Sequence, residues 1–339
     1  MKVMVALSGG VDSTITAKFL KDEGHDIKGC YMMLHDNPKY HEKNIANVKK
    51  IGEFLDIKIY ILDLRDKFNK EVYTPFVEIY KEGKTPNPCA LCNREIKFGE
   101  LLEFALNCGC QKLATGHYVC MDEGLLKVAE DRSKDQSYFL ANIDPKSLKY
   151  ILFPLGAKLK SDVKNIANSY PELISIASQK ESTEICFVDD TYTQILSRHY
   201  NTNLPGNVVD KTGKTIGTHS GYMHYTIGKR RGFTVYGAHD PHFVTSINPE
   251  ENEITVGLKE DLLKKCFETK NRNTFKDLED EFSAYVKIRY RGAKIPAVVK
   301  KGDFGFKVEL KDKVYGIASG QLAVFYDDKE RVIASGFIK

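Results

Sequence analysis

The chain opens with a sequence that determines how its first strand meets its first helix. A β-prone stretch over residues 3–7 runs directly into Ser8-Gly9-Gly10-Val11-Asp12-Ser13, and a helix-like stretch follows from Thr14 to Glu23. Glycines let a backbone turn tightly and approach a phosphate, and the N–H groups at the start of a helix can hold an anion. These residues predict an anion-binding strand-to-helix turn; a tight turn without a ligand is the alternative.

The same six residues lack the Lys of the GxxxxGK[ST] phosphate loop. They resemble instead the SGGxDS loop of the ATP pyrophosphatase (PP-loop) family. That resemblance implies that the turn binds the pyrophosphate of ATP and that the protein adenylates an acceptor oxygen.

Strand and helix patterns alternate through the first part of the chain. Residues 27–33, 58–62 and 112–115 are apolar strand candidates, and residues 44–55 and 95–106 have apolar residues at helical spacing. Such alternation predicts an α/β fold with a doubly wound parallel sheet. The resemblance to the PP-loop family implies that this sheet is like that of the adenine nucleotide alpha-hydrolases. Ligands bind beyond the C-terminal ends of such strands, so the 8–13 turn and the 115–118 turn are expected to line one crevice.

The second part of the chain has a different sequence pattern, with short β-prone runs instead of alternating strands and helices. Frequent glycines separate short β-prone runs after residue 200, residues 243–258 have the pattern of a hairpin, and strand patterns dominate from Phe282 onward. We expect three domains: residues 1–200 with the parallel sheet, a small mixed central domain at 201–270, and a C-terminal antiparallel β-barrel at 271–339.

Composition narrows the class of protein. With 42% hydrophobic and 28% charged residues and no long apolar run, the chain is expected to be a cytoplasmic globular protein that does not enter a membrane. The net charge of +4 is uneven: the segment 270–339 has 15 Lys and Arg against 10 Asp and Glu. That excess favours either a polyanion-binding module or an ordinary solvated surface.

A Cys-x-x-Cys pair follows two prolines in Thr85-Pro86-Asn87-Pro88-Cys89-Ala90-Leu91-Cys92-Asn93. It leads into a predicted helix, and a helix N-terminus favours the thiolate that a reactive cysteine needs. Inert thiols are one alternative. A structural zinc site is another, because Cys108 and Cys110 have the spacing of a second ligand pair.

Further motifs occur in order along nearly the whole chain, among them Ile96-Lys97-Phe98-Gly99, Ala114-Thr115-Gly116-His117-Tyr118, Lys134-Asp135-Gln136-Ser137-Tyr138-Phe139-Leu140, Phe153-Pro154-Leu155-Gly156, Ile185-Cys186-Phe187, Tyr225-Thr226-Ile227-Gly228, Lys287-Ile288-Arg289-Tyr290-Arg291 and Gly320-Gln321. Together with the first loop and the Cys92 segment, they closely resemble the bacterial tRNA-specific 2-thiouridylases. The resemblance implies replacement of O2 of the wobble uridine, position 34, by sulfur in tRNAs for Lys, Glu and Gln. It also implies the cofactors ATP and Mg²⁺.

The implied chemistry suits two separated cysteines. A carbonyl oxygen is a poor leaving group, and adenylation converts it into AMP, so a persulfide sulfur can then attack C2. By the resemblance, Cys186 carries the persulfide, and Cys92 completes the transfer and leaves a disulfide that a reductant must reopen. The two thiols must then approach to disulfide distance at one stage.

The resemblance also assigns binding residues. ATP is implied at Ala6, Leu7, Ser8, Gly9, Gly10, Val11, Asp12, Ser13, Met32 and Gly116. The target base is implied at Asn87, Pro88 and Cys89. Other tRNA contacts are implied at His117, Lys134, Asp135, Gln136, Arg289, Tyr290 and Gln321. For His117 a core histidine is the alternative, and the run Lys229-Arg230-Arg231 is either a tRNA contact or a solvated turn.

Two positions depart from the family. Many members have Asp where this chain has Cys89, so Cys89, Cys92 and Cys186 form a set of three thiols that could instead hold a [4Fe–4S] cluster. The segment 35–44 also lacks a pattern common in the family, and it is expected to be a surface segment.

Two other functions remain open: a PP-loop ligase for a small molecule, and a tRNA-binding protein with a relict nucleotide site. For the main interpretation, the expected partners are tRNA and a cysteine desulfurase or sulfur-relay protein. The protein is expected to act as a monomer.

Overall fold

The computed structural model describes residues 1–179, 185–188 and 190–339. The chain divides into two compact units, each built from separate stretches of sequence. The first unit contains residues 1–72, 89–183 and 327–333, and the second contains residues 73–88, 184–326 and 334–339.

A five-stranded parallel sheet forms the centre of the first unit, with the strand order β3-β2-β1-β4-β7. Its strands are β1 (Lys2–Ala6), β2 (Asp26–Met33), β3 (Lys58–Asp63), β4 (Lys112–Ala114) and β7 (Ile151–Leu152). The chain adds β2 and β3 on one side of β1 and then crosses to add β4 on the other. The order therefore reverses between β1 and β4, which is where open α/β sheets bind ligands.

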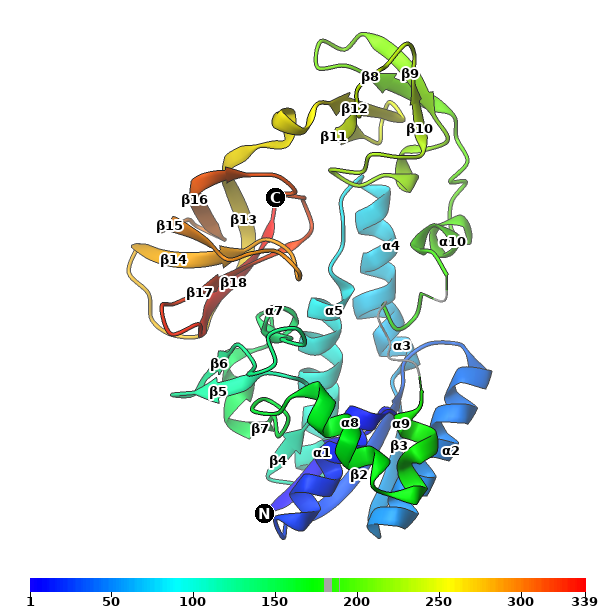
Figure 1. Ribbon diagram of the computed structural model, residues 1–339, viewed down its shortest axis with the longest axis vertical. Coiled ribbons are helices and arrows are strands. Elements are labelled where there is room, and N and C mark those ends of the chain that lie inside the picture. The colour runs from blue at the N-terminus through cyan, green and yellow to red at the C-terminus, as the bar shows by residue number, and fades with distance from the viewer. Residues whose placement is uncertain (180–184, 189) are drawn as a thin grey trace. The chain divides into compact units, whose positions relative to one another are not determined.

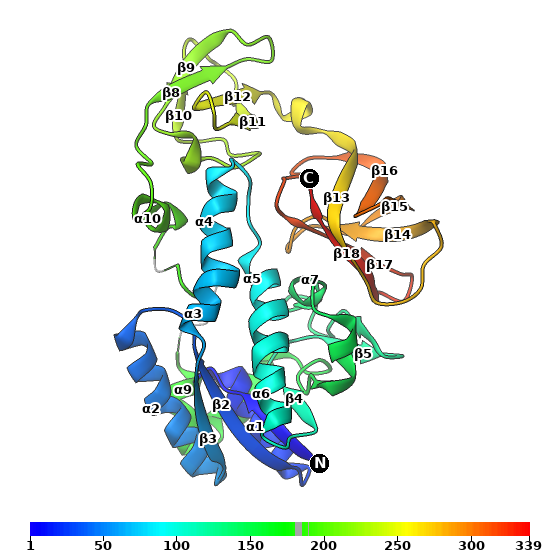
Figure 2. The same cartoon turned by 180° about the vertical axis from the view of Figure 1, so that it is seen from behind.

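Helices cover both faces of this sheet, which confirms the predicted doubly wound fold. Helices α1 (Val11–Asp22), α2 (Pro38–Leu55), α8 (Lys160–Asn168) and α9 (Ile174–Ala177) pack together on one face (Figure 1). A continuous helical segment packs on the other face (Figure 2) and consists of α5 (Pro88–Leu91), η2 (Cys92–Glu100) and α6 (Leu101–Asn107).

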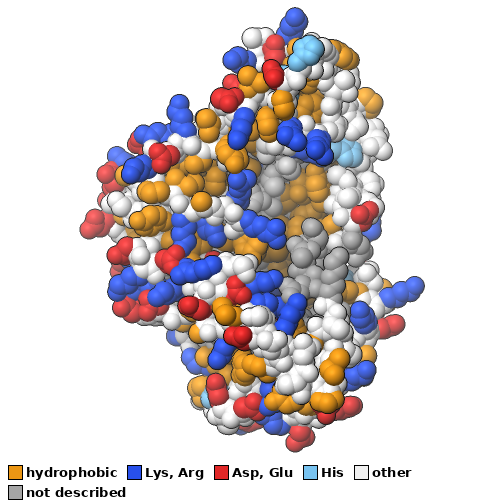
Figure 3. Space-filling model, viewed as in Figure 1, with side chains coloured by type: hydrophobic (Ala, Val, Ile, Leu, Met, Phe, Trp, Pro, Cys, Tyr) orange, Lys and Arg blue, Asp and Glu red, His pale blue; other side chains and the backbone are white. Residues whose placement is uncertain are grey.

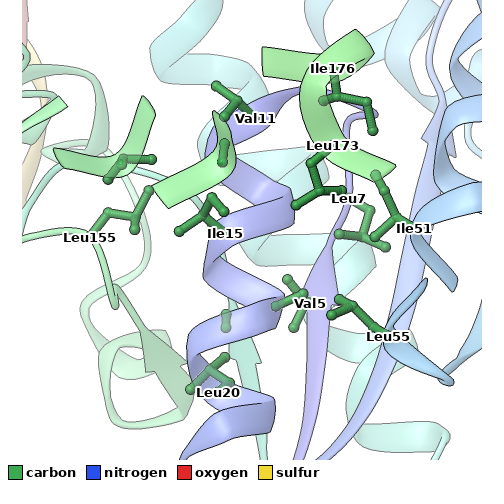
Figure 4. Packing of buried hydrophobic residues seen from close by; sticks show 14 of the residues in the cluster. Val5, Leu7, Val11, Ile15, Leu20, Ile51, Leu55, Leu155, Leu173 and Ile176 are labelled. Atoms are coloured by element: carbon green, nitrogen blue, oxygen red, sulfur yellow. The ribbon is translucent and has the colours of Figure 1, made fainter. Parts of the chain in front are cut away.

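The main core of this unit lies between β1 and the helices beside α1. Val5 and Leu7 on the strand side meet Ile15 of α1, Ile51 of α2 and Ile176 of α9, all of them buried (Figure 4). Each such side chain contributes about 1.5–3 kcal/mol relative to an exposed position. The core therefore fixes α1, and with it the loop that precedes α1, against the sheet.

Helix α2 begins six residues earlier than the 44–55 pattern predicts, and the segment 35–44 lies mostly at the surface, as expected. Asn37 caps the helix, since its side chain accepts a hydrogen bond from the N–H of Tyr40 at 3.2 Å, and Pro38 occupies the first turn. His41 is buried, and its ring nitrogens bond the Tyr31 hydroxyl at 2.8 Å and the His35 carbonyl at 2.6 Å. His41 and Asn44 are thus the buried positions of a segment that is otherwise exposed or half-buried.

Shorter elements complete the first unit. They are α3 (Arg65–Phe68), the π-helical turn η1 (Asn69–Tyr73), the hairpin β5 (Cys120–Asp122) and β6 (Leu125–Lys127), α7 (Ser137–Leu140), η3 (Pro145–Tyr150) and η4 (Pro171–Leu173). The segment 327–333 joins this hairpin: Arg331 forms ion pairs with Glu123 and Asp327, and its backbone bridges to Lys127. Residues far along the chain are thus part of this unit.

The second unit contains a mixed sheet, as the sequence predicts for the central region. Its strand order is β10-β9-β8-β12-β11, antiparallel except for the parallel pair β8–β12, and β11 and β12 form the predicted hairpin. The strands are β8 (Gly206–Val209), β9 (Thr215–His219), β10 (Phe233–Val235), β11 (Phe243–Asn248) and β12 (Glu253–Gly257). Helices α4 (Thr74–Lys81) and α10 (Tyr192–Ser197) and the turn η5 (Tyr222–His224) contribute to its aromatic core.

A closed six-stranded barrel follows the turn η6 (Lys259–Leu262), which confirms the predicted C-terminal barrel. Its strands are β13 (Lys264–Thr274), β14 (Glu281–Lys287), β15 (Ile295–Lys301), β16 (Phe306–Val314), β17 (Leu322–Tyr326) and β18 (Val332–Ile338). Basic and acidic side chains alternate on the barrel face seen in Figure 3, and several pair, as Lys300 does with Glu281 at 2.7 Å. Such pairs neutralise individual lysines but leave the net basic excess of this region unchanged.

No helix in the described part of the chain is long and apolar enough to cross a bilayer.

Candidate functional site

The loop between β1 and α1 is held by its own hydroxyl groups. The Ser8 N–H donates to Ser13 Oγ at 3.1 Å, the two serine hydroxyls lie 3.2 Å apart, and Ser13 Oγ donates to the Gly10 carbonyl at 3.0 Å. Gly9 has a φ of 82°, in the left-handed region that favours glycine, and a Cβ there would lie 3.1 Å from Asn44 Oδ1. The backbone at the start of α1 is thus preformed, as an anion site requires.

A buried lysine holds the carboxylate of this loop. Lys160, at the start of α8, donates to Asp12 Oδ1 at 2.6 Å, and its side chain is only 9% exposed. The Tyr118 hydroxyl donates to the same oxygen at 2.9 Å. The Lys160 backbone N–H in turn donates to Asp131 Oδ2 at 3.0 Å, so a second carboxylate fixes the start of α8. A positive charge is therefore fixed at the first turn of α1.

The turn after β4 lies directly against the first turn of α1. A Cβ on Gly116 would lie 2.9 Å from the backbone of both Asp12 and Ser13, so only glycine allows this approach. The predicted proximity of the two turns is confirmed. Met32, expected at the ATP site, lies near the C-terminal end of the neighbouring strand β2 and is half-buried.

His117 is a half-buried histidine with internal partners. Its Nδ1 shares a hydrogen bond with Thr115 Oγ1 at 2.8 Å, the Lys97 ammonium lies 3.4 Å from its Nε2, and its ring packs against Phe98 and Phe153. Desolvation, followed by the charge of Lys97, lowers the pKa of His117 well below its usual value of 6.5. The ring is therefore neutral at pH 7.

The predicted reactive cysteines of the Cys-x-x-Cys pair lie in the first turns of one helix. Cys89 is partly exposed in α5, and Cys92 is buried at the first position of the π-helical segment η2. Asn142 braces the start of this helix by donating to the Ala90 carbonyl at 3.4 Å, and Asn93 donates to the Phe139 carbonyl at 3.0 Å. π-Helical segments inside helices often occur at functional sites.

Cys186 is exposed, and its neighbours anchor it. Phe187 packs on Phe76 and Tyr73, with ring centroids 5.1 and 5.7 Å apart, within the aromatic core of the second unit. The Val188 N–H donates to the Ile185 carbonyl at 2.9 Å and closes a turn around Cys186. Of the motif that precedes it, residues 181–184 lie outside the described residues. Cys92 belongs to the first unit and Cys186 to the second.

Several residues expected to contact tRNA have internal partners. Asp135 is buried and accepts hydrogen bonds from the N–H groups of Ala129 and Ser137, and Gln136 bonds the backbone of Tyr118 in both directions. Lys134 is half-buried nearby. These residues shape the loop that supports the turn after β4.

The remaining expected tRNA residues lie in the second unit. Arg289 is exposed and its guanidinium stacks 5.4 Å from the Tyr315 ring, and Tyr290 follows it after β14. Asn87 and Pro88 are buried, and Gln321 bonds the backbone just before them. In the run 229–231, Arg230 and Arg231 are exposed, while Lys229 donates to the His224 carbonyl at 2.6 Å.

Sequence reasoning missed Lys160 and the hydroxyl of Tyr118. Lys160 follows the motif at 153–156 by four positions, but it is one of 50 Lys and Arg residues and has no motif of its own. Its burial beside Asp12 is visible only in three dimensions. Within the described residues, no group of three or more His, Cys, Asp or Glu side chains is arranged to hold a metal ion.

Comparison with known proteins places this geometry in a family. The models described as tRNA methyl transferase HUP domain, tRNA methyl transferase PRC-barrel domain and aminomethyltransferase beta-barrel domain match residues 1–190, 193–258 and 264–338.

Full-length relatives give the same assignment. The chain is 62% identical to the tRNA-specific 2-thiouridylase MnmA of Campylobacter curvus and 60% identical to that of Campylobacter concisus, in both cases over 100% of each chain. A solved structure, the U34-tRNA thiolase NcsA of Methanococcus maripaludis with its [4Fe-4S] cluster, is 20% identical, covers 58% of this chain and 64% of its own, and has a TM-score of 0.37. The chain belongs to the family of tRNA-specific 2-thiouridylases, as its full-length relatives establish.

Proposed function

We propose that the protein replaces O2 of the wobble uridine of tRNA by sulfur, using ATP to activate the oxygen. The observation that carries the proposal is the preformed loop at 8–13, whose Asp12 carboxylate is held by Lys160 and Tyr118. Full-length identity of about 60% to tRNA-specific 2-thiouridylases supports the same substrate.

The first step is adenylation. The uridine O2 attacks the α-phosphorus of ATP and forms an O–P bond, the bond from that phosphorus to the bridging oxygen breaks, and pyrophosphate leaves; the N3 proton is lost to solvent. The loop N–H groups at the start of α1 bind the phosphate oxygens, because they point outward from the helix end. The Lys160 ammonium, fixed at this end, stabilises the negative charge on the leaving pyrophosphate.

Asp12 is the residue that would hold Mg²⁺, because a carboxylate oxygen is the ligand that this ion prefers. The ion, bound with ATP, supplies further neutralisation of the phosphate charge. Lys160 and Tyr118 both donate to Oδ1, and so fix the orientation of the carboxylate.

The second step is sulfur transfer. The terminal sulfur of a persulfide on Cys186 attacks C2 and AMP leaves, which joins the base to Cys186 through two sulfurs. The Cys92 thiolate then attacks Cys186 Sγ; the S–S bond breaks, 2-thiouridine leaves, and a Cys92–Cys186 disulfide remains. A thiol reductant reopens it, and a cysteine desulfurase or relay protein renews the persulfide. Asn87, Pro88 and Cys89 hold the base during both steps.

The test is a set of partial reactions on anaerobically purified protein. Iron and sulfide are measured first, and the protein is then mixed with unmodified tRNA, ATP, Mg²⁺ and a persulfide source. We expect iron-free protein to form AMP, pyrophosphate and 2-thiouridine in equal amounts, and Asp12→Ala to form none of them.

Other outcomes overturn particular parts of the proposal. ATP turnover that does not need tRNA would indicate a small-molecule ligase, and tRNA binding without ATP binding would indicate a relict nucleotide site. Activity only with about four irons per chain would make Cys89, Cys92 and Cys186 cluster ligands.

A further inference from the structure

The side-chain amide of Gln321 is committed to the backbone that leads into Asn87. Its Nε2 donates to the Thr85 carbonyl at 3.2 Å and to the Pro86 carbonyl at 2.8 Å. An amide nitrogen has two hydrogens, and these two carbonyls account for both of them. The residue expected to contact tRNA therefore directs its donors to the protein.

The segment around Gln321 is itself fixed to the end of β18. The Gly320 N–H donates to the Ile338 carbonyl at 2.9 Å, and the Ile338 N–H donates to the Gln321 carbonyl at 2.8 Å. Gly320 has a φ of 90°, and a Cβ on it would lie 2.6 Å from the Thr85 carbonyl oxygen. The Thr85 N–H adds a third bond, to the Ser319 carbonyl at 2.8 Å. Ser319, Gly320 and Gln321 thus all contact the backbone of Thr85.

The residues after Thr85 cannot build such support from their own backbone. Pro86 and Pro88 have no N–H, so the 85–88 stretch lacks two of the donors that a turn or a strand would use. Upstream, the Tyr222 hydroxyl donates to the Lys81 carbonyl at 2.7 Å and fixes the end of α4. The conformation that buries Asn87 therefore depends on donors from elsewhere in the second unit, and Gln321 supplies two of them.

We propose that Gln321 is a positioning residue: its amide donors set the backbone at Thr85 and Pro86, and thereby place Asn87 for the target base. This inference rests on the proposed function, in which Asn87 to Cys89 hold the base. A displacement of about 1 Å at such a segment lowers the rate of a reaction by as much as about 100-fold while other contacts persist.

The experiment is the substitution Gln321→Met, which keeps the length of the side chain and removes both donors without adding charge. Three quantities are measured: the Kd for unmodified tRNA, kcat for AMP formation at saturating tRNA, and amide hydrogen exchange in the 82–92 region. We expect the tRNA Kd to stay within about twofold, kcat to fall by about tenfold or more, and exchange at Thr85 to become faster.

Two comparisons make the result decisive. Gln111→Met, at the amino end of β4 where the Gln111 side chain accepts from Lys2, removes a surface amide and should change none of the three quantities. Arg289→Met, at a position expected to contact tRNA, should weaken the tRNA Kd and leave exchange at Thr85 unchanged.

The proposal is overturned if Gln321→Met weakens the tRNA Kd by about tenfold and keeps kcat at saturating tRNA, since that is the signature of a direct tRNA contact. Unchanged exchange at Thr85 would also overturn it. Failure of the wild-type protein to form AMP with tRNA would instead reject the proposed function, so the two failures are distinguishable.

A second variant acts on the same contact without altering Gln321. In Gly320→Ala the added methyl group presses on the Thr85 carbonyl, so the Thr85 backbone must shift. We expect the same pattern of lower kcat and retained tRNA Kd. A variant that keeps the wild-type kcat would contradict the role assigned to this backbone.

Discussion

The loop at 8–13 and the segment around Cys186 carry the two halves of the proposed chemistry, and they are built differently. The loop is fixed by its own hydroxyl groups and by a buried Lys160, at the end of a strand in a parallel sheet. Cys186 is exposed, and the ring of the next residue, Phe187, packs on Phe76.

This difference follows from what each half must do. During adenylation, negative charge develops on phosphate oxygens. Hydrogen-bond donors of the protein stabilise this charge most strongly when they are already in place. A thiol that receives sulfur from another protein and delivers it to a base has to be accessible to both. In the proposed reaction, the preformed loop at 8–13 binds phosphate and the exposed Cys186 carries sulfur.

The largest effect is expected for Cys186→Ser, which should abolish sulfur transfer and leave adenylation intact. The variant keeps the loop at 8–13, so it should adenylate the tRNA and release pyrophosphate at the wild-type rate in a single turnover, yet release no AMP and form no 2-thiouridine. The measurement is nucleoside analysis of the tRNA together with pyrophosphate release. Cys266→Ser, at another exposed cysteine in β13, is the matched control and should thiolate normally. Thiolation by Cys186→Ser would show that the sulfur path is wrong.

The second-largest effect is expected for Lys160→Met, which should slow adenylation. Removing the ammonium leaves the Asp12 carboxylate and the phosphates without their fixed positive charge, so AMP formation should fall by about 100-fold. Rapid-quench measurement at saturating tRNA tests this, and Lys160→Arg should recover part of the rate because the charge is retained.

Lys158→Met is the matched control for that experiment, since Lys158 is exposed and lies 5.4 Å from the Phe19 ring. It should keep the wild-type rate. Full AMP formation by Lys160→Met, with only a lower Tm, would reduce Lys160 to a structural ion pair.

Phe187→Ala should lower sulfur transfer by about tenfold and leave adenylation, measured as pyrophosphate release, unchanged, because the ring fixes the segment beside Cys186 and no part of the nucleotide loop. Single-turnover formation of 2-thiouridine from pre-adenylated tRNA measures it. Phe304→Ala, at a ring that is 83% exposed, is the control for loss of an aromatic side chain. Equal losses in both partial reactions would mean that Phe187 supports the whole unit.

The smallest effect concerns stability rather than rate. His117 has a pKa well below 6.5 in the folded protein, so the unfolded chain binds a proton there that the folded chain does not. The free energy of unfolding should therefore fall as the pH drops below about 6.5, by less than about 1.4 kcal/mol per pH unit for one proton.

His117→Gln should flatten that dependence in urea titrations between pH 7.5 and pH 5.5. His239→Gln, at an exposed histidine, should leave it unchanged. A wild-type curve without the decline would contradict burial of a neutral imidazole.

Local patterns in the sequence predict the fold well and the site only in part. Apolar spacing identifies the parallel sheet and the barrel, because burial on a fixed face leaves a period in the sequence. Motif glycines such as Gly9 and Gly116 are informative for a similar reason, since their backbone positions exclude other residues.

Hydrogen bonds between residues far apart in the sequence leave no periodic pattern of this kind. Lys160 bonds a residue 148 positions earlier, and Gln321 bonds carbonyls 235 and 236 positions earlier, so neither role is visible in local spacing. The three-domain boundaries and the individual site roles stay predictions.

The contribution of residues 327–333 to the first unit has a consequence for synthesis on the ribosome. Arg331 is buried against the β5–β6 hairpin through Glu123, so the nucleotide-binding unit lacks one of its ion-paired anchors until nearly the whole chain has emerged. Domains generally fold in order from the N-terminus during translation. Here the unit that starts to emerge first lacks the Arg331–Glu123 contact until residue 331 has been synthesised.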